Sequence, residues 1–380
     1  MNIKSRLPDV GTSIFAIMSK MAAEADAINL SQGFPDFEVD RVIIDLVNQF
    51  MINGNNQYAP MPGTPALRQV IADVVEKTYS RNVNPETEIT ITAGATEALF
   101  AAISAFVNPG DEVIVFDPSY DSYNPSIRLN GGIPVHINLK YPDFSIDWEE
   151  VKTRITPRTR IIMINTPQNP SGAVLKETDL KTLELLADAH DLIVLSDEVY
   201  ERIIFDGRKH ESVLHYPKLA QRSVAMFSFG KTFHATGWKV GYAVAPEYLM
   251  KEIRKTHQFI TFAVNTPVQL ALAEYMKNPE HYKTLGSFYQ QKRDYFLNGI
   301  KGSSFEPAAC HGSYFQSLSY RSVSTLSDRE MAIELTQKHK VASIPVSVFY
   351  NDKTDNQLLR FCFAKSEDTL DMAIEILRKI

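Results

Sequence analysis

Two lysines, Lys231 and Lys239, stand eight positions apart in the segment SFGKTFHATGWKVGY, residues 228–242. The letters FGKT match the end of a phosphate-binding P-loop, whose consensus is G-x-x-x-x-G-K-[ST]. That motif needs a glycine five positions before Gly230, but Ala225 stands there, within an apolar run typical of a strand. A nucleotide-binding loop is therefore disfavoured. Three interpretations of Lys231 stay open: a nucleophile, a charge that binds a phosphate, or an ordinary surface lysine.

If Lys231 is a nucleophile, its amine could bind a carbonyl cofactor such as pyridoxal phosphate (PLP). This cofactor needs a lysine that forms a Schiff base with it, and an acid that keeps its pyridine nitrogen protonated. Its phenolic oxygen needs hydrogen-bond donors. Its phosphate needs backbone N–H groups at the start of a helix, together with cations. The sequence offers a candidate for each requirement.

Asp197 is the candidate partner of the pyridine nitrogen. It follows the apolar run LIVLS, where a carboxylate would be buried and costly unless paired with a cation. A pyridinium is such a cation. Tyr200 follows three residues later, and Asn169 lies in an NPSG turn. Both side chains can donate a hydrogen bond to the phenolic oxygen.

The phosphate and the ring face have candidates at other strand ends. Ala95 and Thr96 stand at the start of a predicted helix and offer backbone N–H groups. Ser228 adds a hydroxyl and Lys239 a positive charge. Tyr120, in DPSYDSY, could stack on the cofactor ring.

Each of these residues also has an ordinary structural interpretation. An Asp after a strand is often a helix cap or turn residue, and NPSG is a common turn. Tyr120 and Tyr123 could be core aromatics, and a single loop lysine is usually solvated. The order and spacing of the set favour the PLP site over these separate alternatives.

The elements that must position these residues form a repeating pattern. Apolar strand-like runs alternate with amphipathic helices, one at residues 97–107 and one with Leu180, Leu183, Leu186 and Ala189 on a single stripe. The predicted strands are 87–93, 112–116, 160–164, 192–195 and 224–227. Such alternation predicts an α/β fold with a mostly parallel central sheet covered on both faces. Ligands bind beyond the carboxyl ends of such strands, where the candidate residues stand.

The pattern changes near residue 275. Ser327 and Glu330 form a capping box that opens a helix through Lys338. A strand at 358–363 precedes a helix capped by Ser366. We therefore expect a large cofactor-binding domain at 46–275, and a smaller α+β domain built from 1–45 and 276–380.

Composition narrows the class further. The 380 residues are 44% hydrophobic and 22% charged with a net charge of −6, so neither nucleic acid nor an acidic membrane is an expected partner. The two cysteines, Cys310 and Cys362, have no metal-site or CxxC spacing; we expect buried thiols and no metal. The N-terminus lacks the apolar segment of a secretory signal or membrane span, so the expected location is cytoplasmic.

At this point the chain resembles the class I, fold type I PLP-dependent aminotransferases. The matching segments occur in family order over most of the chain: NQYAPMPG (56–63), TAGATEALF (92–100), NTPQNPSG (165–172), SDEVY (196–200), SFGKTFHATGWKVGY (228–242) and LLRFCFAK (358–365). Three further segments resemble the methionine aminotransferase branch, which is related to the kynurenine/glutamine aminotransferases: LSQGFPDF (30–37), GSYFQ (312–316) and IPVSVFY (344–350).

The resemblance implies a role for each matching residue. Lys231 corresponds to the Schiff-base lysine, Asp197 to the partner of the pyridine nitrogen, and Tyr200 and Asn169 to the ligands of the phenolic oxygen. The phosphate ligands are Ala95, Thr96, Ser228 and Lys239, and Tyr120 is the stacking aromatic. Tyr58 corresponds to a tyrosine that reaches the phosphate of the neighbouring subunit, which implies a homodimer. Arg360 corresponds to the arginine that binds the substrate α-carboxylate, and Gly33, Asn169 and Phe15 belong to the substrate site.

The family pattern implies transamination between an amino acid and a 2-oxo acid, by ping-pong kinetics through an internal aldimine on Lys231. Lys239 departs from the pattern, since many relatives have arginine there. No second arginine suits a distal carboxylate, which favours a neutral substrate side chain, methionine-like or aromatic. Its pocket is expected to include Ile14, Phe15 and Tyr58.

Two other functions remain open. A carbon–sulfur β-lyase uses the same lysine, aspartate and arginine but expels a substituent from Cβ. A ligand-sensing regulator on the same scaffold would need an added DNA-binding module, for which the sequence offers no segment.

Overall fold

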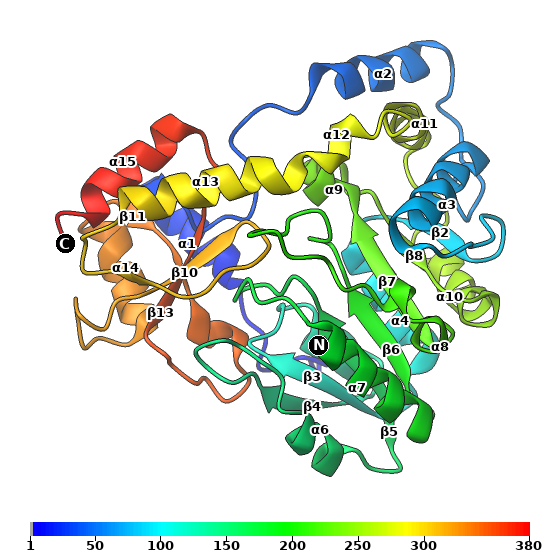
Figure 1. The fold of residues 1–380 in the computed structure, drawn as a ribbon, viewed down its shortest axis with the longest axis horizontal. Helices are drawn as coiled ribbons and strands as arrows, with labels where there is room; N and C mark the ends of the chain where they lie inside the picture. Colours follow the sequence, from blue (N-terminus) through cyan, green and yellow to red (C-terminus); the bar gives the residue numbers. More distant parts are fainter. Residues whose placement is uncertain (1–2) are drawn as a thin grey trace.

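The computed structural model describes residues 3–380, and within them the largest sheet has seven strands in the order β2-β8-β7-β6-β5-β3-β4 (Figure 1). Its strands are β2 Ile89–Thr92, β3 Glu112–Asp117, β4 Ile133–Asn138, β5 Thr159–Asn165, β6 Ile193–Asp197, β7 Ser223–Ser228 and β8 Gly241–Val244. The pairs from β7 to β4 are parallel, whereas β8 runs antiparallel to both β2 and β7. The predicted mostly parallel α/β sheet is confirmed.

Alternating side chains of the buried strands face two separate hydrophobic layers. In β3, Val113 and Val115 pack in one layer and Ile114 in the other. The first layer is completed by α4 (Ala95–Phe106), α5 (Tyr123–Leu129) and α10 (Glu247–Ile260), and the second by α3 (Pro65–Tyr79) and α7 (Glu177–Ala189). Both faces of the sheet are therefore covered, as expected for strands that are apolar on both sides.

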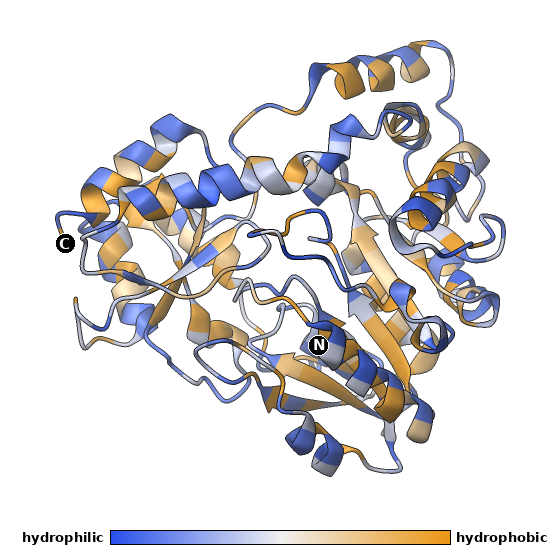
Figure 2. Cartoon of the chain, in the orientation of Figure 1, coloured by the Kyte–Doolittle hydropathy of each residue, from blue (hydrophilic) through white to orange (hydrophobic). Residues whose placement is uncertain are grey.

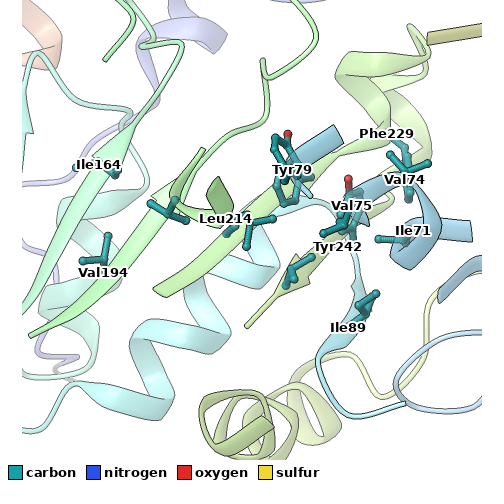
Figure 3. Close-up of a cluster of buried hydrophobic side chains, with 14 of the residues drawn as sticks. Ile71, Val74, Val75, Tyr79, Ile89, Ile164, Val194, Leu214, Phe229 and Tyr242 are labelled. Carbon is teal, nitrogen blue, oxygen red and sulfur yellow. The ribbon is translucent and has the colours of Figure 1, made fainter. Parts of the chain in front are cut away.

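Figure 3 shows part of the second layer, where Ile71 and Val75 of α3 lie near Ile89 and Tyr242 of the sheet. Tyr242 stacks on Phe227 with ring centroids 4.7 Å apart. This packing fixes the short strand β8 against β7, directly behind the segment that carries Lys231.

A second, smaller body lies beside the large sheet (Figure 1). Its four-stranded sheet has the order β12-β13-β10-β9, and a two-stranded pair joins β1 to β11. These strands are β1 Ile28–Asn29, β9 Glu306–Pro307, β10 Phe315–Ser319, β11 Val341–Ala342, β12 Ile344–Pro345 and β13 Leu358–Cys362. Its helices are α1 Ile14–Glu24, α13 Leu285–Gly299, α14 Asp328–Gln337 and α15 Glu367–Leu377. The hydropathy colours of Figure 2 show apolar strands in both sheets and polar residues on the outer helices.

The N-terminal residues lie in two places. Ile28 of β1 pairs with Val341 of β11, which ties the segment of α1 and β1 to the C-terminal part. Helix α2 (Arg41–Ile52) packs instead against α11 (Thr266–Tyr275), and the Tyr275 hydroxyl donates to Asp40 at 2.7 Å. The remaining short helices are α6 Trp148–Arg154, α8 Pro217–Ala220, α9 Phe229–Thr232 and α12 Glu280–Lys283.

Each strand and helix predicted from the sequence is present, but two strands of the large sheet and most strands of the smaller body were not predicted. Ser327 and Ser366 cap α14 and α15, and the capping box at Ser327 is formed. Strands β4 and β8 were not predicted, because IPVHIN is a partly exposed edge strand and GYAV is only four residues long. Cys310 and Cys362 are free and buried, as expected. Within residues 3–380, every helix is too short or too polar to span a membrane.

Candidate active site

A cavity of about 230 Å³ lies beyond the carboxyl ends of β5, β6 and β7. The predicted site residues that line it are Phe15, Gly33, Ala95, Thr96, Tyr120, Asn169, Asp197, Tyr200, Ser228, Lys231, Lys239 and Arg360. These residues come from distant parts of the chain and from both bodies of the fold. The structure thus brings together every predicted residue except two, Tyr58 and Ile14, which are not part of the lining.

Asp197 ends β6 and is 5% exposed. Its Oδ2 accepts a hydrogen bond from the Tyr123 hydroxyl at 2.6 Å, and its Oδ1 accepts one from the Val199 N–H at 3.3 Å. Burial raises the pKa of Asp197 to about 6, although the hydrogen bond from Tyr123 opposes that rise. A cation inside the cavity would stabilise the ionised form of this buried carboxyl group.

Lys231 lies in the short helix α9, which follows β7 directly. Desolvation lowers the pKa of its amine to about 8, and the nearby positive charges of Lys239 and Arg360 act in the same direction. The amine lies 5.6 Å from the ring centroid of Tyr314. A lysine of this kind holds a substantial neutral fraction near physiological pH, as a nucleophile or a base requires.

The N-terminus of α4 forms another part of the cavity wall. Gly94 precedes the helix with a φ of 77°, and the first N–H groups of the helix, those of Ala95 and Thr96, have no partners within it. The Lys239 amine lies 3.5 Å from the position a Cβ on Gly94 would take. A Cβ on Gly241 would lie 2.9 Å from the Ala95 nitrogen, so glycine there lets β8 approach the helix start. The arrangement suits a phosphate dianion.

Arg360 of β13 lines the cavity from the smaller body and is 1% exposed. Its guanidinium carbon lies 3.8 Å from the ring centroid of Phe315, and its Nη1 and Nη2 donate to Asn169 Oδ1 at 2.8 Å and to the Ser31 carbonyl at 3.1 Å. Nε has no hydrogen-bond partner in the described chain. Burial lowers the pKa of Arg360 to about 10, so the group stays charged at neutral pH.

The contact with Arg360 also orients Asn169. Since the amide oxygen accepts from the guanidinium, the amide nitrogen is free to donate into the cavity. Tyr200 is 3% exposed, and burial raises its pKa, so the hydroxyl keeps its proton and remains a donor. Tyr120 also lines the cavity, and burial raises the pKa of its hydroxyl.

This donor set fits PLP. An amine with a lowered pKa, a buried carboxyl that lacks a cation, two phenolic-oxygen donors and an anion-binding helix start line a single cavity. The four features belong to different segments that line the cavity, as the separate ring substituents of PLP demand. Fold and cavity together define an enzyme of the fold type I, PLP-dependent class.

Comparison with known proteins agrees with this class. Residues 25–377 match the family model for aminotransferase class I and II. A methionine aminotransferase of Escherichia coli is 50% identical over 378 residues, covering 99% of this chain and 98% of the relative. A crystal structure of an Escherichia coli protein described as having a methionine aminotransferase function superposes with a TM-score of 0.98 at 50% identity, over all of both chains. A human kynurenine–oxoglutarate transaminase is 32% identical, covering 98% of this chain and 89% of the relative.

The chain therefore belongs to the class I and II aminotransferases, which depend on PLP and transfer an amino group between amino acids and 2-oxo acids. The resemblance inferred from the sequence is confirmed, as are the fold class and the cofactor.

Several lining residues were not assigned from the sequence: Gln32, Leu99, Asn165, Val199 and Phe315. Asn165 donates to the Asp197 carbonyl at 2.9 Å and accepts from the Asn169 N–H at 2.8 Å, so it joins two strand ends. The motif NTPQNPSG contains it, and its place at the end of a predicted strand was the available signal. Phe315 lies in GSYFQ, but nothing local indicates that its ring supports Arg360.

Proposed function

We propose that this protein transaminates an amino acid with a neutral, methionine-like or aromatic side chain, with a 2-oxo acid as amino acceptor. The observation that carries the proposal is the charge of the cavity wall. Its cationic lining residues are Lys231, Lys239 and Arg360, and its apolar lining residues include Phe15, Val199 and Phe315. A second carboxylate would have no arginine to pair with among the lining residues. The likeness to a methionine aminotransferase supports the same choice.

Arg360 is proposed to bind the substrate α-carboxylate. Two of its nitrogens are already directed by Asn169 and Ser31, and the ring of Phe315 limits its motion. Charge-assisted hydrogen bonds in parallel would fix the carboxylate plane and, with it, the direction of the Cα–H bond.

The residues proposed to hold PLP divide among its parts. Lys231 would bind it covalently, Asp197 would pair with the pyridine nitrogen, and Tyr200 and Asn169 would donate to the phenolic oxygen. The phosphate would be held by Ala95, Thr96, Ser228 and Lys239, and Tyr120 would cover one ring face. When bound, PLP supplies an electron sink for the negative charge that develops at the substrate Cα.

Lys231 is also proposed as the proton carrier. With its pKa lowered to about 8, its Nζ can accept the Cα proton when neutral and return it as an ammonium. Asp197, as a carboxylate, would keep the pyridine nitrogen protonated and so favour the withdrawal of negative charge from Cα. The first 2-oxo acid leaves before the second enters the same cavity, which predicts ping-pong kinetics.

We propose that the enzyme acts as a homodimer. An exposed apolar surface near the end of α10 contains Tyr58 at 84%, Phe259 at 85% and Phe262 at 45% exposure. The Tyr58 and Phe262 rings lie edge to face at 5.5 Å. Large apolar groups gathered on one exposed face mark an interaction surface. Tyr58 lies outside its own cavity, which agrees with a role in the partner's phosphate site.

The domain division at 46–275 against 1–45 and 276–380 is proposed as well. The separate hydrophobic clusters of the two sheets support it. Helix α2 crosses the first boundary, and its Ile43 belongs to the core of the large sheet. A cytoplasmic location is also proposed, supported by the two free thiols.

A half-reaction screen tests the substrate proposal. The PLP-loaded protein is mixed with single amino acids, and loss of the visible cofactor absorbance is followed together with the 2-oxo acid released. Methionine and aromatic amino acids should react far faster than aspartate or glutamate, and a preference for the dicarboxylic substrates would overturn the proposal. Release of pyruvate and ammonia from cystathionine, without need of an oxo acid, would indicate the β-lyase instead.

A further inference from the structure

Tyr314 lies behind the cavity wall and contacts three parts of the site. It is fully buried and directly precedes β10. Its ring meets that of Tyr200 edge to face, with centroids 5.1 Å apart at 82°. The Lys231 amine lies 5.6 Å from the same ring, and the Tyr314 hydroxyl bonds the Gly33 carbonyl at 2.6 Å.

The hydrogen bond of this hydroxyl has a fixed direction. The Gly33 carbonyl can only accept, so it receives the single proton of Tyr314. The bond therefore joins Tyr314, next to the ring of Tyr200, to the backbone of Gly33.

Gly33 belongs to a loop that lines the cavity. A Cβ on Gly33 would lie 2.7 Å from the Phe315 ring that supports Arg360. Two residues earlier, the Ser31 carbonyl accepts from Arg360. The loop therefore rests on the arginine and its aromatic support, and the Tyr314 hydroxyl holds it there.

We propose that Tyr314 is a positioning residue, whose hydroxyl holds the Gly33 loop at the carboxylate-binding end of the site. It does not touch the reacting atoms. It acts through Gly33 on the geometry around Arg360, so its loss should weaken substrate binding more than the chemical step. The expected change in substrate binding rests on the proposed function. The hydrogen bond between Tyr314 and Gly33 does not, because it needs neither cofactor nor substrate.

Tyr314→Phe tests the proposal by removing one oxygen and leaving the ring in place. In the cofactor-free protein, amide hydrogen exchange in the segment Ser31–Phe34 should become about fivefold faster, as expected for the loss of one net hydrogen bond. In the loaded enzyme, KM for the amino acid should rise about fivefold while kcat stays within about twofold.

Tyr289→Phe is the matched control. Tyr289 is also fully buried, its ring centroid lies 5.7 Å from that of Tyr314, and its hydroxyl has no hydrogen-bond partner among residues 3–380. It should change neither exchange in the loop nor KM. Unchanged loop exchange in Tyr314→Phe would overturn the inference, and so would an equal change in Tyr289→Phe or a fall in kcat with KM unchanged. Because exchange is measured without cofactor or substrate, its result stands apart from any failure of the proposed function.

Discussion

The Tyr123 hydroxyl donates a hydrogen bond of 2.6 Å to Oδ2 of Asp197, and both side chains are buried. Tyr123 begins α5 and packs in the layer on one face of the sheet, whereas Asp197 ends β6. The bond stabilises the ionised carboxylate, which burial alone would protonate. A residue that serves as a core aromatic thus also sets the charge of the proposed pyridine partner.

Replacing Tyr123 by Phe should raise the pKa of Asp197 above its present value of about 6. More of the carboxyl is then protonated near neutral pH, so PLP binding and kcat/KM should both fall, and the acid limb of each pH profile should move to higher pH. Hydrogen bonds to charged groups contribute about 1.5–3 kcal/mol, so kcat/KM should fall roughly tenfold to a hundredfold. Steady-state kinetics and equilibrium binding from pH 5 to pH 8 measure both effects.

The control for this change is Tyr295→Phe. The Tyr295 hydroxyl also donates to an aspartate, Asp371, at 2.6 Å, but at the exposed surface. It should leave both pH profiles in place. Profiles of Tyr123→Phe that coincide with the wild type would show that the bond does not set the charge of Asp197.

Lys231 should make the cofactor-free protein less stable below pH 8 than above it. Its pKa is about 8 in the folded chain against 10.5 for an ordinary lysine, so the unfolded chain binds more protons between these values. The penalty for burying the charge is fully present below pH 8 and disappears as the pH rises through 10.5. Lys231→Met should therefore be more stable than the wild type at pH 7, by up to about 3 kcal/mol, with the advantage shrinking as the pH rises.

Urea unfolding of the cofactor-free proteins at several pH values measures this difference. Lys255→Met controls for the loss of one positive charge, since Lys255 is exposed and pairs with Glu252. A stability difference for Lys231→Met that grows with pH would contradict the argument. The same variant should have no transaminase activity, because it lacks the residue proposed as covalent anchor and proton carrier.

Most of the site could be predicted because its residues belong to short segments at strand ends. Asp197, Asn169 and Lys231 each follow an apolar strand, and parallel strands bring their carboxyl ends to one edge. The contacts of Tyr123 and Tyr314 could not be predicted in this way. Their hydroxyl partners lie 74 and 281 positions away, and only tertiary packing decides which buried tyrosine meets which acceptor.

The same distinction between local signals and tertiary contacts applies to the elements of the fold. Long apolar runs such as β5 and capped helices such as α14 are defined by local signals, and both were predicted. Strand β8 begins two residues after Lys239, at the end of the segment with both lysines that was assigned from the sequence to the cofactor site. It becomes a strand because Tyr242 packs on Phe227 and because Gly241 permits close approach to α4. Neither contact has a local sequence signal.

Arg360→Lys should raise KM for amino acids at least about a hundredfold. A lysine has no second nitrogen to keep both the α-carboxylate and the Asn169 contact, and it cannot stack flat on Phe315. Loss of two charge-assisted hydrogen bonds at about 1.5 kcal/mol or more each accounts for the size of the effect. Arg293→Lys is the control, because Arg293 is also buried and binds both oxygens of Asp206 outside the cavity. That variant should lose stability and keep its KM, whereas a near-normal KM for Arg360→Lys would contradict the carboxylate assignment.

His257 and Glu97 should contribute to PLP binding as a unit. His257 Nδ1 lies 3.0 Å from the Glu97 carboxylate, Nε2 lies 3.1 Å from the Met61 carbonyl, and the other oxygen of Glu97 accepts from the Ala93 N–H at 3.0 Å. The pair thus links the phosphate end of the cavity to the loop that carries Tyr58. Removing one partner leaves the other buried without its bond.

Glu97→Gln and His257→Gln should each weaken PLP binding about tenfold, and the double variant should cost less than the sum of the two in free energy. Equilibrium dialysis with PLP and urea unfolding of the cofactor-free proteins measure the two quantities. His190→Gln, at an exposed position, is the control for the histidine change. Strictly additive costs would mean that the two residues act separately.

The apolar surface of Tyr58, Phe259 and Phe262 should hold two copies of the chain together. Phe259→Asp places a charge where an apolar contact is expected, so the protein should become monomeric and lose most of its activity, since Tyr58 could no longer reach the partner's site. Leu185→Asp is the matched control, because Leu185 is 72% exposed on α7, away from this surface, and should leave a dimer. Sedimentation velocity gives the assembly state and PLP titration gives the cofactor affinity. A Phe259→Asp protein that stays dimeric and active would place the interface elsewhere, whereas a monomer with full PLP affinity would separate dimerisation from a role of Tyr58 at the phosphate.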